Sequence, residues 1–171
     1  MNFVEDSLDY HRVHRAPTDI FLGELPRVWA DAPAALLLNF CPDSPSGPRG
    51  DRRSISLPLH DTVEAERSPN RSELEHFLQQ VHPLVHQQPS YWHCHAGINR
   101  SSFALAAYLH LYRGLSISGA IQSLRIQRSP RVLCNYSFES LLRKWYGTEA
   151  EQDFPRMERE TTEQLRNKRA D

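Results

Sequence analysis

A short apolar strand runs through a glycine-containing loop directly into a long apolar helix between residues 91 and 113. Residues 91–94 have strand character, Gly97 follows in the loop, and residues 101–113 repeat apolar side chains at helical spacing before Gly114, which suits a helix C-cap. Successive N–H groups of such a loop point inward, and the helix dipole adds positive potential. The segment therefore predicts a cradle for an anion.

Cys94 lies at the mouth of this cradle, so we expect the pKa of its thiol to be depressed and its thiolate to act as a nucleophile. Arg100 follows six residues later, where its planar fork can hold two phosphate oxygens. Ser101 is placed to donate a hydrogen bond to the sulfur. We predict that these three residues are catalytic and that the loop between them binds phosphate, through His95, Ala96, Gly97, Ile98 and Asn99 together with Arg100.

The stretch HCHAGINRS resembles the HC-x-x-G-x-x-R-S phosphate-binding loop of the protein tyrosine phosphatase superfamily, and specifically of its small dual-specificity members. The resemblance covers residues 18–146, because residues 20–26 are similar to the first strand and turn of the family. Residues 131–138 are similar to the segment that precedes its last helix. Asn99 departs from the family, which often has a small hydroxyl residue or glycine there, so we expect altered fine geometry and retained activity.

The resemblance also implies an aspartate general acid upstream of the cysteine, after a short strand. Asp61 stands 33 residues before Cys94 and is the only aspartate between Arg53 and Cys94. This placement suits proton donation to a departing oxygen. Glu64 and Glu66 are the reserve acids, and the alternative for Asp61 is a turn residue that closes the strand.

Three further residues, His93, Arg128 and Arg131, have roles that follow from their neighbourhood. We expect His93 to support the loop by hydrogen bonding. Arg128 and Arg131 lie in the segment that flanks the active site in relatives, so they are candidates for substrate contact. A metal site formed by His93, Cys94 and His95 is disfavoured, because neighbouring strand residues point to opposite faces and no second cluster supplies ligands. No metal or organic cofactor is expected.

Other arginines and cysteines favour structural interpretations. The arginines of the Pro- and Gly-rich segment 41–53 are expected to be solvated, with contact to a second anionic group as the alternative; they are Arg49, Arg52 and Arg53. Cys41 and Cys134 are expected to be buried small apolar residues, with a role as resolving thiols after oxidation of Cys94 as the alternative.

Strand and helix patterns alternate along the chain and predict a single α/β domain of the dual-specificity phosphatase type, with a small central mixed sheet flanked by helices on both sides. We expect the catalytic domain to span residues 1–147 and residues 148–171 to form a polar tail or surface helix. A capping box at Ser72 and Glu75 predicts a helix that Pro83 kinks or ends. Strands are expected at 18–25, 35–40 and 54–59, a loop at 41–53, and helices from 72, at 101–113, 116–128 and 136–146.

Composition narrows the function classes. The 171 residues carry a formal charge of −1, which argues against a surface built throughout for nucleic acid. An odd count of three cysteines is no disulfide framework, and neither a signal pattern nor a membrane span is evident, so we expect a cytoplasmic protein without membrane contact.

The resemblance implies hydrolysis of phosphomonoesters through a phosphocysteine intermediate, with phosphotyrosine, phosphoserine or phosphothreonine in proteins as substrates. The loop lacks the lysine that phosphoinositide-directed relatives tend to carry, which favours phosphoproteins. An RNA 5′-triphosphatase and a non-catalytic phospho-binding module are the alternatives, whereas a glucan phosphatase would need a carbohydrate-binding module for which 171 residues leave no room. The oligomeric state is not predicted.

Overall fold

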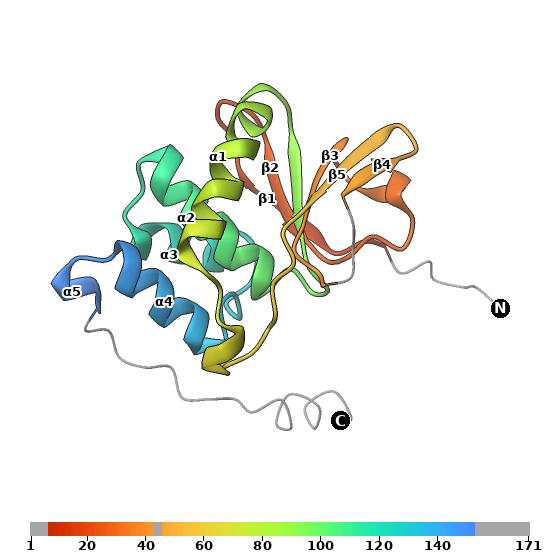
Figure 1. Ribbon diagram of the computed structural model, residues 1–171. Helices are drawn as coiled ribbons and strands as arrows, with labels where there is room; N and C mark the ends of the chain where they lie inside the picture. Colours follow the sequence, from red (N-terminus) through yellow and green to blue (C-terminus); the bar gives the residue numbers. More distant parts are fainter. Residues whose placement is uncertain (1–6, 43–45, 153–171) are drawn as a thin grey trace, which may run out of the picture.

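A six-stranded mixed sheet forms the centre of the computed structural model, which describes residues 7–42 and 46–152 (Figure 1). The four inner strands are parallel, and an antiparallel strand closes each edge. The sheet order is β1-β2-β6-β3-β5-β4. The strands are β1 (Tyr10–His14), β2 (Ile20–Gly23), β3 (Leu36–Asn39), β4 (Gly47–Arg49), β5 (Arg52–Ser56) and β6 (Ser90–His93).

The long helices cover one face of this sheet (Figure 1). The α-helices are α1 (Arg71–Gln87), α2 (Arg100–Arg113), α3 (Ile117–Gln127), α4 (Tyr136–Tyr146) and the short α5 (Glu149–Gln152), and two 3-10 helices are η1 (Trp29–Asp31) and η2 (Ala65–Arg67). The α/β fold class is confirmed. Among the described residues the α-helices all lie on this one face, and the other face is covered by the N-terminal segment and the region around the 3-10 helix η1.

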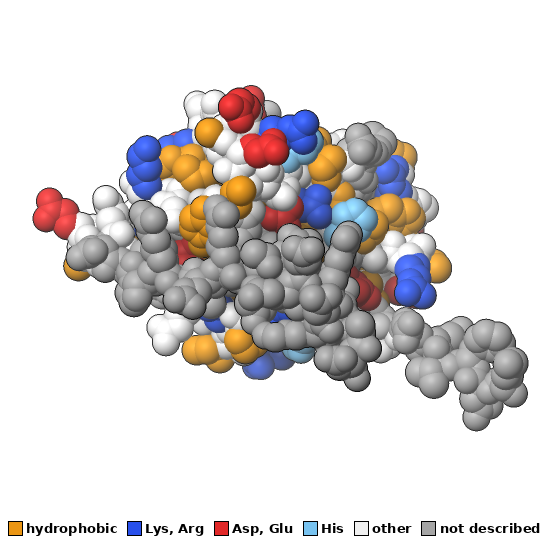
Figure 2. All heavy atoms as spheres, turned by 90° about the horizontal axis from the view of Figure 1, so that it is seen from below, with side chains coloured by type: hydrophobic (Ala, Val, Ile, Leu, Met, Phe, Trp, Pro, Cys, Tyr) orange, Lys and Arg blue, Asp and Glu red, His pale blue; other side chains and the backbone are white. Residues whose placement is uncertain are grey.

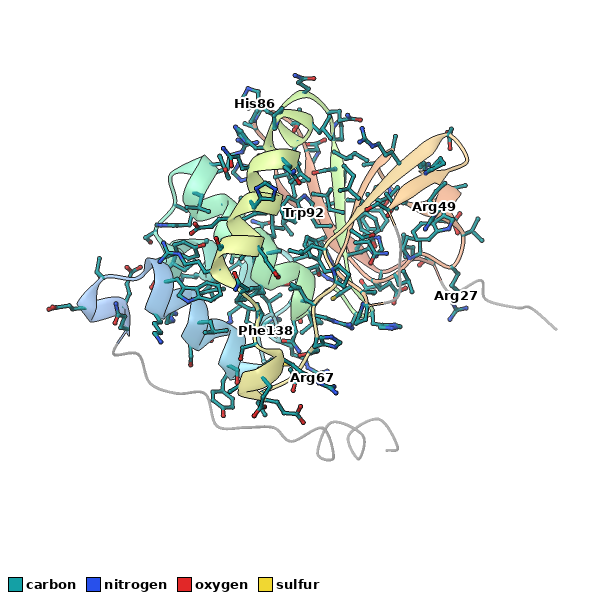
Figure 3. All side chains as sticks on the ribbon, viewed as in Figure 1. Arg27, Arg49, Arg67, His86, Trp92 and Phe138 are labelled. Carbon is teal, nitrogen blue, oxygen red and sulfur yellow. The ribbon has the colours of Figure 1, made fainter. Side chains whose placement is uncertain are left out.

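The alternation of side chains along the inner strands produces these two faces. Leu36 and Leu38 of β3 face the helices, whereas Leu37 faces the layer around η1. On β6, Trp92 points into the helical layer, where its ring lies 5.3 Å from that of Tyr108 (Figure 3). β3 and β6 are therefore buried on both sides, which the continuous apolar run at 35–40 predicted for β3.

Two strands were not expected from the sequence. β1 is mostly exposed and buries Val13 alone, so its sequence lacks the alternation that marks a half-buried strand. β4 lies within the expected loop 41–53 and pairs antiparallel with β5 at the edge of the sheet, where the missing N–H of Pro48 is tolerated. β5 also begins earlier than expected, at Arg52.

The first helix differs from the expected one at its start. Asn70, not Ser72, is the N-cap, and its side chain accepts a hydrogen bond from the Glu73 amide at 3.0 Å. Glu75 is not part of a capping box, since it pairs with Arg71 at 2.8 Å. The helix also continues through Pro83 to Gln87.

The remaining expectations concern the ends and the surface. The tail expected at 148–171 begins with α5, and residues 153–171 lie outside the described residues, so the division at 147 stays a prediction. Figure 2 shows acidic and basic side chains interspersed over the described part of one face, in line with the small net charge. Within the described residues, no helix combines the length and apolar character that crossing a bilayer requires. The cytoplasmic location stays a prediction.

Candidate active site

Two of the predicted catalytic residues, Cys94 and Asp61, lie in loops that follow the carboxyl ends of the parallel strands. Cys94 follows β6 directly, Cys41 follows β3 and Asp61 lies in the segment after β5. The turn after β2 packs beside them, because the amide of Leu25 donates to the carbonyl of His95 at 3.1 Å. Parallel sheets bind ligands at this edge, so the topology brings together residues that are distant in sequence.

Every carbonyl of the loop from His95 to Asn99 is turned outward and accepts a hydrogen bond from the surrounding protein. With the carbonyls held outside, the amides are left to face inward, which is the geometry of an anion nest. The donors are the amides of Leu25 to His95, Leu133 to Ile98 and Phe103 to Asn99 at 2.8–3.1 Å, and the Arg128 guanidinium to Ala96 at 3.0 Å and to Gly97 at 3.5 Å.

Gly97 is required by two features of this loop. Its φ of 65° lies in the left-handed region. A Cβ atom there would lie 2.3 Å from the carbonyl oxygen of Gly23 and 2.4 Å from its carbonyl carbon. The loop therefore rests directly on the backbone at the end of β2, with no room for a side chain between them.

The thiol of Cys94 is only 2% exposed and lies 3.3 Å from the hydroxyl of Ser101. Burial would raise the pKa of Cys94, but the hydroxyl and amide of Ser101, the charge of Arg100 and the amide of Ile98 outweigh it and lower the pKa below that of an ordinary thiol. The surroundings of Cys94 therefore lower the pKa of its thiol, in the direction that the sequence predicted. This sulfur is suited to nucleophilic attack at neutral pH.

Arg100 is the first residue of α2, and its charge acts on the thiol below it. Its Nε is buried without a hydrogen-bond partner among the described residues, and no ion pair with them occupies its guanidinium. An unpaired buried donor is costly unless a ligand satisfies it. The arrangement can therefore hold an oxyanion between the loop amides and this side chain.

Asp61 approaches the phosphate-binding loop through two asparagines. Its Oδ2 accepts a hydrogen bond from Asn99 at 3.0 Å, and its Oδ1 accepts one from Asn135 at 2.8 Å. The carboxylate is thus brought beside the residue that precedes Arg100. The reserve acids Glu64 and Glu66 are exposed, and Glu64 instead pairs with Arg67 at 3.7 Å.

His93 is held by ring packing and makes none of the expected hydrogen bonds with the described residues. It is fully buried, and neither ring nitrogen has a hydrogen-bond partner among the described residues. The ring stacks on Tyr91 at 5.4 Å and lies 5.9 Å from Trp29. Burial lowers the pKa of His93 to about 3, so the imidazole stays neutral beneath the loop.

Arg128 was expected to contact substrate, and the structure places it elsewhere. Its side chain is 3% exposed, holds the two loop carbonyls and forms a bidentate pair with Asp9 at 2.7 and 2.9 Å. Asp9 was not identified from the sequence, since a lone aspartate before an unrecognised strand carries no signal. Arg131 is exposed, and its contact with substrate stays a prediction.

The other basic and cysteine residues have local roles. Arg52 donates to the carbonyls of Ala34 and Ala30, both at 2.9 Å, so the expectation of a solvated side chain is wrong for this residue. Cys41 is buried as expected, and burial raises its pKa to about 11. Cys134 is half-buried. Residues 7–42 and 46–152 contain no group of three or more His, Cys, Asp or Glu arranged to hold a metal ion.

Comparison with known proteins places this site in a family. The model of the dual specificity phosphatase catalytic domain matches residues 35–148, which is more than half of the chain and includes the whole loop from Cys94 to Ser101. The chain belongs to the dual specificity phosphatase family. By family and fold it is thus a phosphatase of the protein tyrosine phosphatase superfamily.

Solved structures share the fold of this dual specificity phosphatase at low sequence identity. A mouse putative dual specificity phosphatase complexed with zinc tungstate is 24% identical, with a TM-score of 0.66 over 92% of this chain and 99% of that one. Human DUSP28 is 24% identical, with a TM-score of 0.61 over 85% and 97%. PTPMT1 is 21% identical, with a TM-score of 0.58 over 80% and 92%. No curated protein matches the chain.

Proposed function

We propose that this phosphatase hydrolyses phosphomonoesters through a phosphocysteine intermediate on Cys94. The observation that carries the proposal is the geometry around this buried thiol: the carbonyls from His95 to Asn99 bond to the protein outside the loop, and the Ser101 hydroxyl lies 3.3 Å from the sulfur, an arrangement that lowers the pKa of Cys94. Burial alone would keep the thiol protonated. The loop amides and Arg100 overcome that cost and would equally stabilise the oxygens of a transferred phosphoryl group.

The proposed reaction has two steps. The Cys94 thiolate attacks phosphorus in line, and the bond to the leaving oxygen breaks as Asp61 supplies a proton to it. In the second step Asp61 takes a proton from water, which attacks the phosphocysteine and releases inorganic phosphate and the thiolate. Ser101, 3.3 Å from the sulfur, would donate a hydrogen bond that stabilises the departing thiolate.

Phosphorylated proteins are the proposed substrates. His95 and Ala96 are exposed, so the loop lies near the surface, and a site near the surface accepts the short side chains of phosphoserine and phosphothreonine as well as phosphotyrosine. The tungstate in the mouse relative is an oxyanion of the kind that the nest would bind. RNA with a 5′-triphosphate is the alternative substrate.

The test is turnover by purified wild-type protein and by Cys94→Ser on phosphotyrosine, phosphothreonine and 5′-triphosphorylated RNA substrates. We expect phosphate release from the phosphopeptides and near-total loss in Cys94→Ser with peptide binding retained. Vanadate should compete with substrate, because it occupies the same nest. If the wild type released γ-phosphate from the RNA and no phosphate from the phosphopeptides, the proposed substrate class would be wrong. If it bound the phosphopeptides without turnover, the proposal that it is an active enzyme would be wrong.

A further inference from the structure

Asn99 stands where the family often has a small residue, and its side chain connects three parts of the site. Its Oδ1 accepts a hydrogen bond from the backbone amide of Asn135 at 3.0 Å, and its Nδ2 donates to Asp61 Oδ2 at 3.0 Å. A backbone N–H is always a donor, so the Asn99 oxygen must face it and the nitrogen must face the carboxylate. The orientation of this amide is therefore fixed.

Asn135 holds the other oxygen of the same carboxylate. Its Nδ2 donates to Asp61 Oδ1 at 2.8 Å and to the carbonyl of Thr62 at 3.2 Å. Its Oδ1 accepts from the amide of Ser137 at 3.1 Å and caps α4. The Asn135 amide is thus also fixed, and each oxygen of Asp61 is bound by one amide.

The segment that carries Asp61 depends on these bonds for its position. Residues 57–64 form no helix or strand, and Asp61 itself is exposed. The start of the segment is anchored at the end of β3, since the amides of Leu57 and Leu59 donate to the carbonyls of Asn39 and Phe40 at 3.0 and 3.2 Å. Beyond Leu59 its own bonds are local: the Thr62 amide donates to the carbonyl of His60 at 3.0 Å, and the Glu64 amide donates to the Thr62 hydroxyl at 3.1 Å. Three side-chain hydrogen bonds from Asn99 and Asn135 therefore hold the irregular part of the segment that carries Asp61.

We propose that Asn99 is a positioning residue that ties the segment carrying Asp61 to the phosphate-binding loop, so that the acid and the phosphate site are assembled together. The inference rests on the proposed function, because it concerns the acid of that reaction. A serine or glycine at this position could not reach both Asp61 and the Asn135 amide. The connection between the Asp61 segment and the phosphate-binding loop therefore depends on the asparagine that this chain has at position 99.

The kinetic test compares aryl phosphates whose leaving groups differ in acidity. A poor leaving group needs the proton of Asp61, whereas a very acidic one does not. Asn99→Ala should lower kcat/KM roughly ten-fold for phenyl phosphate and leave it nearly unchanged for the most acidic leaving group, since positioned acids supply about 10²-fold or more. Asn70→Ala, which removes an asparagine cap from α1 outside the site, is the matched control and should affect neither.

A double-mutant cycle with Asp61→Asn separates positioning from general damage. If Asn99 acts through the acid, Asn99→Ala should cause no further loss in the Asp61→Asn background. Equal loss with all leaving groups, or losses that multiply in the double variant, would overturn the inference while leaving the proposed function intact.

Hydrogen exchange gives a readout that does not depend on activity. In Asn99→Ala the amides of Thr62 and Glu64 should exchange faster, with exchange in α2 unchanged, because their segment loses one of its three side-chain bonds to the site. Unchanged exchange at these amides would overturn the tie whether or not the protein turns over phosphate. An absence of turnover in the wild type, by contrast, would contradict the proposed function. The exchange measurement would then still test whether Asn99 holds the Asp61 segment.

Discussion

Replacing Gly97 with alanine tests how closely the phosphate-binding loop depends on the backbone beneath it. The new Cβ would lie 2.3 Å from the Gly23 carbonyl oxygen, whereas ordinary contact begins at 3.4 Å, so the two backbones must separate by about 1 Å. The residue would also keep a φ of 65°, at a cost of about 1–2 kcal/mol for a residue with a side chain.

The expected consequence for catalysis follows from that displacement. A shift of about 1 Å in a positioned group costs on the order of 10²-fold in rate, so we expect kcat/KM for an aryl phosphate to fall by at least about that factor. Gly114→Ala is the matched control, since Gly114 also has a positive φ of 73° but nothing lies within 4 Å of its Cβ position. It should lose about 1 kcal/mol of stability and keep its activity.

The assay is kcat/KM for both variants, with urea denaturation to measure the free energy of unfolding. Gly97→Ala should be less stable than Gly114→Ala and should be the only one of the two to lose activity under conditions where both are folded. Equal activity in the two folded variants would refute the argument that the loop sits on the Gly23 backbone without room for a side chain.

Three further predictions concern the contacts around the loop and the last helix. Arg128→Met should lower kcat/KM about ten-fold or more and weaken vanadate inhibition, because two loop carbonyls lose their donor; unchanged inhibition would contradict this. The hydrogen bond from Arg128 lowers the pKa of Asp9, so Asp9→Asn should cost less than about 1 kcal/mol at neutral pH. In urea titrations this difference should start to shrink as the pH falls below the pKa of an unfolded aspartate and vanish once the pH has fallen through the lowered pKa of Asp9. Hydrogen bonds from the amides of Thr148 and Ser118 lower the pKa of Glu151 to about 2, so Glu151→Gln should reduce stability at neutral pH, with a difference that is lost as the pH falls towards that value; a constant difference would contradict it.

Local signals in the sequence were sufficient for the centre of the fold. The apolar run at 35–40 and the segment 91–113 have clear periodicity, so β3, β6 and α2 were found within a residue or two. The motif placed Cys94 and Arg100 correctly because strand, loop and helix are contiguous there. Asp61, the proposed acid, was located by the resemblance, and the structure brings it to the loop through Asn99.

Contacts between distant segments were not accessible in the same way. The side chain of Arg128 is fixed by Asp9, 119 residues away, and no local pattern relates the two. β1, which follows Asp9, was missed because only Val13 of its residues is buried. The expectation that Arg52 is solvated was wrong for a similar reason. Its partners are the backbone carbonyls of Ala34 and Ala30, and any residue could supply a backbone carbonyl. Side-chain contacts that only the tertiary fold brings together cannot be predicted from the hydropathy pattern of the sequence.

The ionisation of Cys94 tests the central claim most directly. The ultraviolet absorbance of thiolate, taken as the difference between wild type and Cys94→Ser, reports this sulfur alone across a pH titration. Cys41, whose pKa burial raises to about 11, provides an internal comparison through Cys41→Ser. We predict that the Cys94 signal appears at lower pH than that of free cysteine, whereas a signal that appears only near the pKa of free cysteine, about 8.5, would contradict the account.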